Sequence, residues 1–477
     1  MTKTRVAVVG AGPGGYAAAV RASQLGADVT LVEKEKAGGT CLNWGCTPSK
    51  VMKTAADLLE QVRRAGEFGV MVEGDPAPDM AALMRRKERV IQGQIQGLLH
   101  LFKARGIRHL RGHGRLEGAG RLSVTAADGG RETVEWDRLI LATGSAPAPL
   151  PDLPFDGAGI LSSDQALCLD VVPDAMVIVG GGVIGCEFAS IFSGLGSRVT
   201  LVEAMNRLLP VPGVDETCTK TLLREMKKRK IRVLVDAGVE GVEQRGGRCA
   251  VRIGPSPFAE AEVPKGPMET VDAACVLVCV GRRPNTAGLG LENVGLEPDP
   301  AGWIAADDRL MTGAADVYAV GDALGPGRIM LAHVATAEGR LAAENALGRD
   351  RPMRYDVVPG AIFTSPEIGV VGRTEAEAKE DGLRVRSESV LFRTLGKAQV
   401  LGRIEGEAKL VLEEETGRIL GAHLVGAGAT DLVAEAALAI RTGCTVQDVA
   451  DTIHAHPTLA EILLEVAGKA SGRPFHA

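Results

Sequence analysis

The sequence predicts a multidomain α/β protein, with two similar parallel-sheet domains followed by a smaller α+β domain. At roughly 150 residues per domain, a chain of 477 residues has room for about three domains. A glycine-rich pattern occurs twice, and the residue pattern changes after about residue 355. Hydrophobic residues make up 45% and charged residues 24% of the chain, as in ordinary folded proteins.

The repeated pattern is a short apolar run, a glycine-rich turn, a helix-length stretch and a second apolar run that ends in glutamate. The first copy begins at Val6 and ends at Glu33, and the second begins at Val177 and ends at Glu203. Corresponding glycines, such as Gly10 and Gly180, lie 170 positions apart. Each copy is typical of a strand, a helix and a parallel strand. The repeat therefore predicts two parallel-sheet domains.

The rest of the chain is read from periodicity and from proline and glycine. We expect a helix over 80–102, short strands over 122–143, an exposed loop over 255–270 and a buried strand over 275–281. Near the C-terminus we expect strands around 358–363 and 408–412 and helices around 431–443 and 459–470. Four prolines between 147 and 154 place a boundary near residue 150. The expected segments are 1–150, 151–281, 282–354 and 355–477.

Charge and cysteine content exclude several classes of protein. With 54 basic and 60 acidic residues the net charge is −6, which gives no general attraction to nucleic acid or to an anionic membrane. The longest stretch without a charged residue, 6–20, is shorter than the roughly 20 residues of a membrane span. Nine scattered cysteines fit a reducing compartment. We therefore expect a cytoplasmic protein.

Both glycine-rich turns are candidate dinucleotide sites. A lone G-x-G-x-x-G is common in tight turns, and two duplicated turns without a ligand are the alternative. Here each turn follows a strand, opens a helix and precedes by 23 positions a glutamate that ends the next strand. Absent side chains let backbone N–H groups approach a pyrophosphate, and the glutamate accepts hydrogen bonds from a ribose. Two Rossmann-like domains are predicted, with Gly10, Gly12, Gly15 and Glu33 at the first site and Gly180, Gly182, Gly185 and Glu203 at the second.

The second site favours NAD over NADP. The carboxylate of Glu203 would repel a 2′-phosphate, which NADP carries and NAD lacks. Arg207, four positions on, is the feature that favours NADP.

Cys41 and Cys46 lie five positions apart just after the first repeat. No Cys or His cluster nearby completes a tetrahedral zinc site, so a local disulfide is favoured. Residues five apart on an ideal helix have Cα atoms about 8.6 Å apart, whereas a disulfide needs roughly 4.4 to 6.8 Å. The turn must therefore be distorted, and Gly45 offers the backbone freedom. Strained, accessible disulfides are easily reduced, which indicates redox work.

The segment 38–50, GGTCLNWGCTPSK, resembles the redox-disulfide segment of the flavin-dependent pyridine nucleotide-disulfide oxidoreductases. The resemblance extends over essentially the whole chain. It implies that the first glycine turn binds FAD and that the last domain forms a homodimer interface. The further cofactor-binding residues are Thr143, Gly144, Gly321 and Asp322 for FAD and Gly281 for NAD.

The resemblance also implies roles around the disulfide. Cys41 would exchange with a substrate thiol, and Cys46 would face the flavin as the charge-transfer thiolate. Lys50 would lie near flavin N5 and pair with Glu187. Trp44 and Thr47 stand where the family has aliphatic residues, so the substrate channel is expected to differ.

A histidine near the C-terminus is the candidate base. For an isolated His456, followed by Pro457, a solvated residue at a helix start is the ordinary interpretation. Dithiol oxidation needs a base, however, and an imidazole with a pKa of about 6.5 suits it. Glu461 can fix its tautomer. The resemblance implies that this pair acts across the dimer interface on the disulfide of the other subunit. His454 is expected to be structural, and for His333 and Glu338 structural and functional roles are equally open.

The resemblance implies oxidation of a protein-bound dihydrolipoyl group by NAD+, through the disulfide and FAD. The partner would be the lipoyl-bearing protein of a 2-oxoacid dehydrogenase or a glycine cleavage system. One alternative is another NAD(P)H-dependent disulfide or metal-ion reductase of the family. The other is a non-catalytic flavoprotein subunit, against which the intact Cys41, Cys46, His456 and Glu461 argue.

Overall fold

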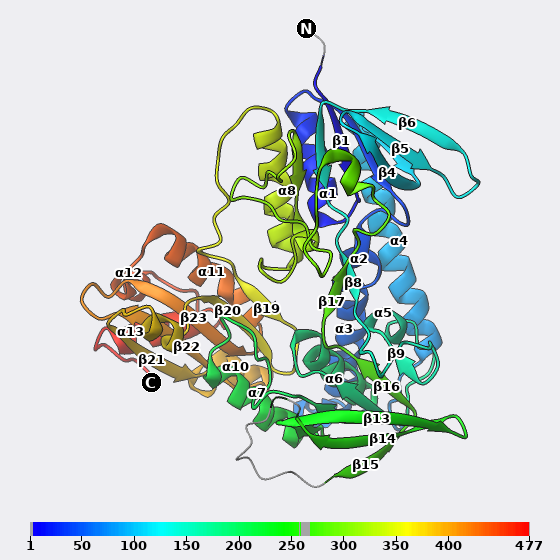
Figure 1. Ribbon diagram of the computed structural model, residues 1–477. Helices are drawn as coiled ribbons and strands as arrows, with labels where there is room; N and C mark the ends of the chain where they lie inside the picture. Colours follow the sequence, from blue (N-terminus) through cyan, green and yellow to red (C-terminus); the bar gives the residue numbers. More distant parts are fainter. Residues whose placement is uncertain (1–2, 257, 259–267, 477) are drawn as a thin grey trace.

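The computed structural model describes residues 3–256, 258 and 268–476 (Figure 1). The first sheet is parallel, in the order β18-β7-β1-β2-β3. Helices α1 (Pro13–Gln24) and α8 (Ala332–Ala346) pack closely, since a Cβ on Gly339 would lie 2.0 Å from the carbonyl oxygen of Gly14. The strands are β1 (Arg5–Val9), β2 (Asp28–Glu33), β3 (Arg108–Arg111), β7 (Arg138–Leu141) and β18 (Val317–Ala319).

The second sheet repeats this design in the order β12-β11-β10-β16-β9, again with parallel pairs. Its central strand β10 is apolar throughout and buried on both faces, as expected for a parallel strand between layers. The elements are β9 (Ile160–Leu161), β10 (Ala175–Val179), α6 (Val183–Leu195), β11 (Arg198–Val202), α7 (Glu216–Lys228), β12 (Arg232–Leu234) and β16 (Cys275–Val278). An antiparallel sheet follows, with β13 (Ala237–Arg245), β14 (Arg248–Pro255) and β15 (Glu269–Ala273).

The third unit is an antiparallel sheet in the order β19-β20-β23-β22-β21 with helices packed against it (Figure 1). Strand β23 is buried along its whole length because α7 and α11 both contact it. The elements are β19 (Gly360–Ile362), β20 (Glu367–Gly372), α9 (Glu375–Glu380), β21 (Val385–Leu391), α10 (Gly396–Leu401), β22 (Glu407–Glu413), β23 (Ile419–Gly426), α11 (Ala429–Thr442), α12 (Val446–Asp451) and α13 (Glu461–Ala470).

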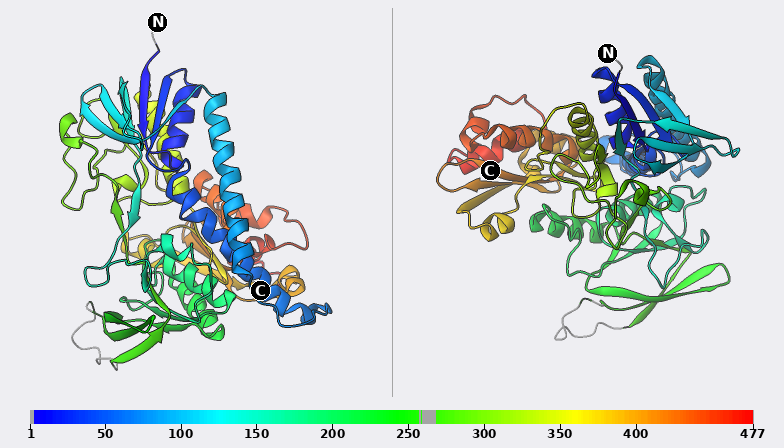
Figure 2. Two further views of the ribbon diagram at one scale, coloured as in Figure 1. Left: turned by 90° about the vertical axis from the view of Figure 1, so that its right-hand side faces the viewer. Right: turned by 45° about the horizontal axis from the view of Figure 1, so that its top comes forward.

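The remaining elements join the sheets. The long helix α4 runs beside α3 (Figure 2), and it begins where the Asp79 side chain accepts a hydrogen bond from Ala82 N–H. A short antiparallel pair, β8 with β17, lies between the two parallel sheets. These elements are α2 (Gly39–Asn43), α3 (Cys46–Arg63), α4 (Met80–Ala104), β4 (His113–Gly118), β5 (Arg121–Thr125), β6 (Arg131–Glu135), β8 (Ser145–Pro147), α5 (Ser163–Ala166) and β17 (Arg282–Pro284).

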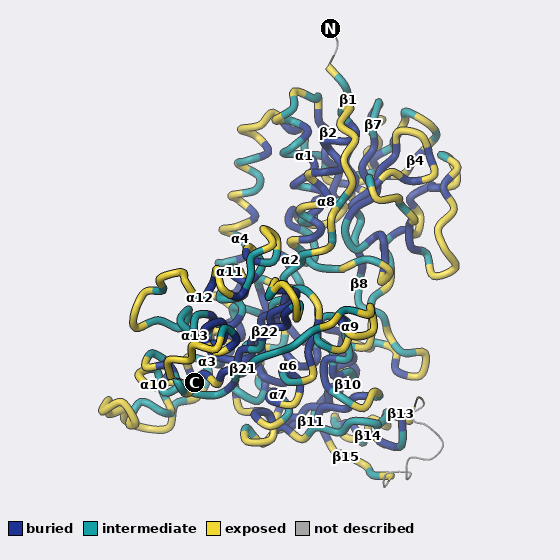
Figure 3. Tube along the Cα trace, turned by 90° about the vertical axis from the view of Figure 1, so that its left-hand side faces the viewer, coloured by how far each residue is buried: buried dark blue, intermediate teal, exposed yellow. Residues whose placement is uncertain are grey.

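The predicted fold class is confirmed: two Rossmann-like units and a C-terminal α+β unit. Residues deep in each sheet are buried while helix outer faces are exposed (Figure 3). The expected loop at 255–270 lies largely outside the described residues, and Glu269 and Thr270 belong to β15. Within the described part of the chain, no helix combines the length and apolar character that a membrane crossing requires.

Candidate active site

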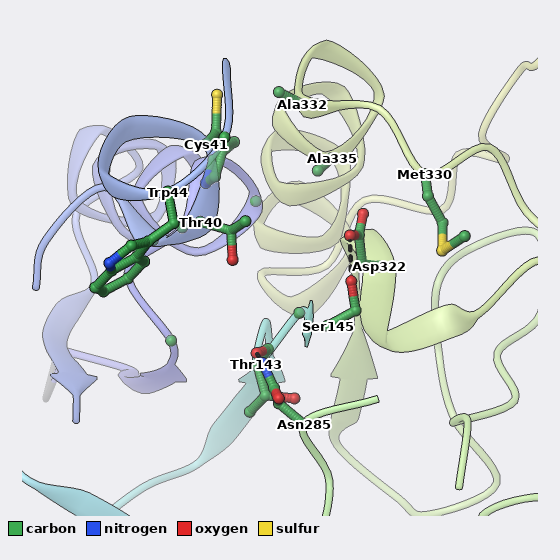
Figure 4. A pocket seen from close by; sticks show the side chains of 18 of the residues that line it. Thr40, Cys41, Trp44, Thr143, Ser145, Asn285, Asp322, Met330, Ala332 and Ala335 are labelled. Atoms are coloured by element: carbon green, nitrogen blue, oxygen red, sulfur yellow. Dashed lines mark hydrogen bonds between the residues drawn. The ribbon is translucent and has the colours of Figure 1, made fainter. Parts of the chain in front are cut away.

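A cavity of about 730 Å³ opens where the first sheet, the cysteine helices and the second sheet meet. Figure 4 shows Cys41, Thr143 and Asp322 around it, on three separate stretches of chain. Gly10, Gly12, Gly144, Lys50 and Glu187 also line it, as do Gly321 and Glu33. The topology therefore gathers most of the predicted flavin and redox residues, from distant parts of the sequence, around one space.

The first glycine turn has the geometry that a pyrophosphate site needs. Gly10 has a φ of 102°, which favours glycine, and α1 begins just after Gly12. A Cβ on Gly15 would lie 1.8 Å from the carbonyl oxygen of Gly10, so no other residue fits there. A Cβ on Gly12 would meet nothing closer than 3.8 Å. Gly15 thus serves packing, whereas Gly12 leaves space at the helix N-terminus.

We expect Gly15→Ala to lower the melting temperature by several degrees, because overpacking of this kind costs about 1–3 kcal/mol. Gly12→Ala is the matched control, since its Cβ has room in the folded chain, and it should instead weaken FAD retention. Thermal unfolding with and without added FAD measures both. Equal melting temperatures for the two flavin-free variants would contradict this assignment.

Both glutamates predicted to bind a ribose are held by the backbone of their own turn. Glu33 accepts hydrogen bonds from Ala11 N–H at 2.7 Å and Glu35 N–H at 2.8 Å, and burial raises its pKa. Glu203 accepts from Gly181 N–H and from Met205 N–H, the latter at 2.7 Å. Each glutamate therefore also shapes its glycine turn, a function that the sequence analysis missed.

Arg207, the residue that would favour NADP, makes a hydrogen bond within the protein. The Arg207 guanidinium donates to the Val214 carbonyl oxygen at 3.2 Å. Gly281, predicted at the NAD site, directly precedes β17, and its carbonyl accepts a hydrogen bond from Ala148 N–H at 3.0 Å. The structure therefore places this predicted NAD residue in the connection between the two sheets.

Cys41 and Cys46 lie on two short helices separated by a break. Helix α2 ends at Asn43, and α3 begins at Cys46 after Gly45, whose φ and ψ are −139° and −106°. The distortion predicted at Gly45 is confirmed. The structure records both cysteines as free thiols, and each shifts the pKa of the other.

The two thiols have different acidities. The hydrogen bond from Cys41 and the charge of Lys50 lower the pKa of Cys46 to about 7. Cys46 also begins α3, where the helix dipole favours a thiolate. The hydrogen bond with Cys46 raises the pKa of Cys41, as does burial. At neutral pH a large fraction of Cys46 is therefore thiolate, and Cys41 keeps its proton.

Lys50 is fixed by an ion pair that spans the units. Its Nζ lies 2.8 Å and 3.0 Å from the two carboxylate oxygens of Glu187, on α6 of the second sheet. Glu187 also accepts from Phe363 N–H at 3.0 Å, and the Lys50 Nζ lies 4.4 Å from the centroid of the Phe363 ring. The predicted Lys50–Glu187 contact is present, next to the thiols.

A polar network positions Asp322. Ser145 Oγ donates to Asp322 Oδ2 at 2.5 Å (Figure 4), and Arg282 Nε donates to the same hydroxyl at 2.6 Å. Asn285 Nδ2 donates to the Thr143 carbonyl oxygen at 3.2 Å. Sequence reasoning missed Ser145, Arg282 and Asn285 because no local motif links them.

The buried hydroxyl of Thr143 bears on whether the cavity fits FAD. Its Oγ1 is buried, and among the described residues it has no hydrogen-bond partner. Gly144 and Gly321 have φ values of 67° and 68°, which bring bare backbone to the cavity wall. An unpaired buried hydroxyl is costly unless a ligand completes it. The residues present therefore fit the flavin nucleotide.

Two residues whose roles were open have structural contacts. Glu338 is 1% exposed and accepts from Gly321 N–H and from Tyr355 Oη, both at 2.6 Å. It therefore holds the turn before Asp322. His333 lines the cavity with its Nε2 2.9 Å from the Pro359 carbonyl oxygen.

His456 and Glu461 form the expected pair. His456 Nδ1 lies 2.8 Å from Glu461 Oε1, and Thr458 N–H donates to Glu461 Oε2 at 2.8 Å. Burial acts to raise the pKa of Glu461, but these two hydrogen bonds hold it below its usual value. His454, whose side chain is only 4% exposed, bonds the Thr452 carbonyl and Glu435 and so anchors this loop. His456 itself is exposed and does not line the cavity of its own chain.

Residues 4–339 match the family described as pyridine nucleotide-disulphide oxidoreductase, and residues 358–467 match its dimerisation domain. The chain belongs to this family. Its cofactors are FAD and NAD, in agreement with the two glycine turns, and the dimerisation domain supports a homodimer.

Curated relatives match along the full chain. The dihydrolipoyl dehydrogenase of Halobacterium salinarum is 42% identical over 480 residues, covering 100% of this chain and 98% of the relative. That of Haloferax volcanii is 40% identical, with the same coverage. Among solved structures, LpdA (Rv3303c) from Mycobacterium tuberculosis is 29% identical with a TM-score of 0.88, covering 98% of this chain and 99% of that one.

Proposed function

We propose that the chain is a dihydrolipoyl dehydrogenase, which oxidises the dihydrolipoyl group of a lipoyl-bearing protein and reduces NAD+ to NADH. The observation that carries the proposal is the thiol pair itself: Cys41, Cys46 and Lys50 line one cavity, and both Cys41 and Lys50 lower the pKa of Cys46. The names of the full-length relatives support it. When bound, FAD takes the electron pair from the thiols and passes it to NAD+.

The residues of the chain account for the thiol chemistry. In the oxidised enzyme, His456 of one subunit takes the proton of a dihydrolipoyl thiol at its Nε2, because Glu461 occupies Nδ1. The resulting thiolate attacks the Cys41 sulfur and releases Cys46 as a thiolate. A thiol with a pKa of about 7 leaves more readily than an ordinary one. The second substrate thiol then attacks the mixed disulfide and passes its proton to Cys41, which leaves as a free thiol as the lipoyl disulfide closes.

The partner is proposed to be the lipoyl-bearing protein of a 2-oxoacid dehydrogenase or a glycine cleavage system, in the cytoplasm.

Anaerobic mixing of the holoenzyme with dihydrolipoamide tests the reaction. We expect the flavin absorbance to fall within the time of one turnover. It should recover when NAD+ is added. An unchanged flavin spectrum with dihydrolipoamide, together with reduction by NADH, would favour another disulfide reductase of the family.

The coenzyme preference follows from Glu203. We expect Glu203→Ala to lower the ratio of kcat/KM for NAD+ to that for NADP+ by about tenfold or more, because a carboxylate that repels the 2′-phosphate is lost. Arg207→Ala is the control, and its preference should stay within about twofold because its guanidinium bonds Val214. Steady-state kinetics with both coenzymes measure the ratio. If Glu203→Ala left the preference for NAD+ over NADP+ unchanged, Glu203 would not determine the coenzyme.

A further inference from the structure

The C-terminal segment 471–476 folds back along α13. Arg473 N–H donates to the Gly468 carbonyl oxygen at 2.7 Å. The Arg473 guanidinium lies 3.0 Å from Asp451 Oδ1 of α12. These contacts bring His476 beside Glu465, on the same helix that begins with Glu461.

Glu465 is a buried carboxylate, 4% exposed. Its hydrogen-bond partners among the described residues both belong to His476: the backbone N–H at 3.1 Å and the ring Nδ1 at 2.8 Å. A buried charge without a partner is costly, so the C-terminal segment supplies what this carboxylate needs. Glu465 follows Glu461 by four positions, which places the two side chains on one face of α13.

Two imidazole–carboxylate pairs therefore lie one helical turn apart, His456 with Glu461 and His476 with Glu465. Both imidazoles are exposed, whereas both carboxylates are largely covered. Two carboxylates act to raise the pKa of His476: Glu465, to which it is hydrogen-bonded, and then Glu461.

Charged groups on the neighbouring elements are already paired. Asp451 of α12 pairs with Arg473, and Lys469 pairs with Glu388 of β21 at 3.5 Å. Among the described residues, His476 is thus the side chain that pairs with Glu465.

We propose that His476 is a positioning residue for the acid-base reaction: its imidazolium offsets the charge of Glu465, so that this second carboxylate does not add to the effect of Glu461 on His456. This inference rests on the proposed role of His456 as the base. Without the cation, a second carboxylate charge one turn from Glu461 favours the imidazolium form of His456. Thiol oxidation would then need a higher pH.

The pH range of the pairing suits this role. The hydrogen bond with Glu465 and its charge raise the pKa of His476. The imidazolium of His476 therefore neutralises Glu465 fully below the ordinary histidine pKa of about 6.5. This neutralisation is lost as the pH rises through the raised pKa of His476. It acts on the acid side of the pH profile, where the protonation of His456 limits the rate.

The test is the acid limb of kcat/KM for dihydrolipoamide in the holoenzyme. We expect His476→Gln to move its midpoint upward by roughly 0.5 pH unit, which gives about threefold lower kcat/KM on the acid side and an unchanged plateau. His476→Lys keeps the cation and should retain the wild-type limb. The double variant Glu465→Gln/His476→Gln removes both charges and should also restore it.

The outcomes separate this inference from the function on which it rests. An unshifted limb in His476→Gln overturns the inference, as does an equal shift in the single and double variants, which would indicate packing instead of charge. A wild-type enzyme that fails to oxidise dihydrolipoamide while it oxidises NADH with an artificial acceptor would instead remove the proposed function. Flavin content and melting temperature of each variant identify any loss of folding.

Discussion

Cys46→Ser eliminates dihydrolipoamide oxidation in our account, with a fall in kcat/KM of roughly 10⁴-fold or more. Without the second sulfur no disulfide exists to accept the electron pair, and a serine hydroxyl at the start of α3 cannot leave as a thiolate does. Oxidation of NADH by an artificial acceptor bypasses the thiols and should continue. Steady-state rates of both reactions on one flavin-loaded preparation make the comparison.

Two further cysteine variants sharpen this prediction. Cys41→Ser should lose the dithiol reaction to the same extent, because each sulfur is half of one bond. Cys168→Ser is the matched control, since Cys168 is an exposed free cysteine that does not line the cavity. Dithiol oxidation that persists in either Cys41→Ser or Cys46→Ser would contradict the account.

His456→Ala should lower kcat/KM for dihydrolipoamide by about 10²- to 10⁴-fold, the usual contribution of a positioned base. The reaction of NADH with an artificial acceptor should change by less than about threefold, because that reaction bypasses the thiols that His456 serves. Glu461→Gln should cause a smaller loss, since its amide keeps a hydrogen bond to the Nδ1 position but loses the charge. Equal losses in both reactions for His456→Ala would remove the base assignment.

The local parts of this fold could be predicted from the sequence because they depend on local physics. A strand, a glycine turn and a helix follow each other directly in both repeats, and the distortion at Gly45 follows from the reach of a disulfide. Strands that join a sheet from a distant part of the chain could not be predicted in this way. Strand β18 joins the first sheet beside β7 although the whole second sheet lies between them in the chain.

Site residues could be predicted where the family resemblance named them. Residues that reach the site through long-range contacts could not. Arg282 meets Ser145 over 137 positions, and no local pattern marks either residue. Likewise, nothing in the sequence around Glu465 indicates that a residue eleven positions on folds back to pair with it. The glutamates that end β2 and β11 were interpreted only as ribose ligands, because their bonds to the preceding turn depend on side-chain orientation.

One measurement tests the central claim, that Cys41 and Cys46 exchange an electron pair with the substrate. Trypsin cleaves after Lys36 and Lys50, so both cysteines lie in a single peptide, 37–50. Alkylation of the anaerobic enzyme followed by mass spectrometry counts its thiols before and after dihydrolipoamide is added. The account predicts an unlabelled, disulfide-bonded peptide before addition and two labelled cysteines after it, with the remaining cysteines unchanged. Two labelled cysteines in the air-oxidised enzyme before addition, or a peptide that dihydrolipoamide leaves unlabelled, would contradict it.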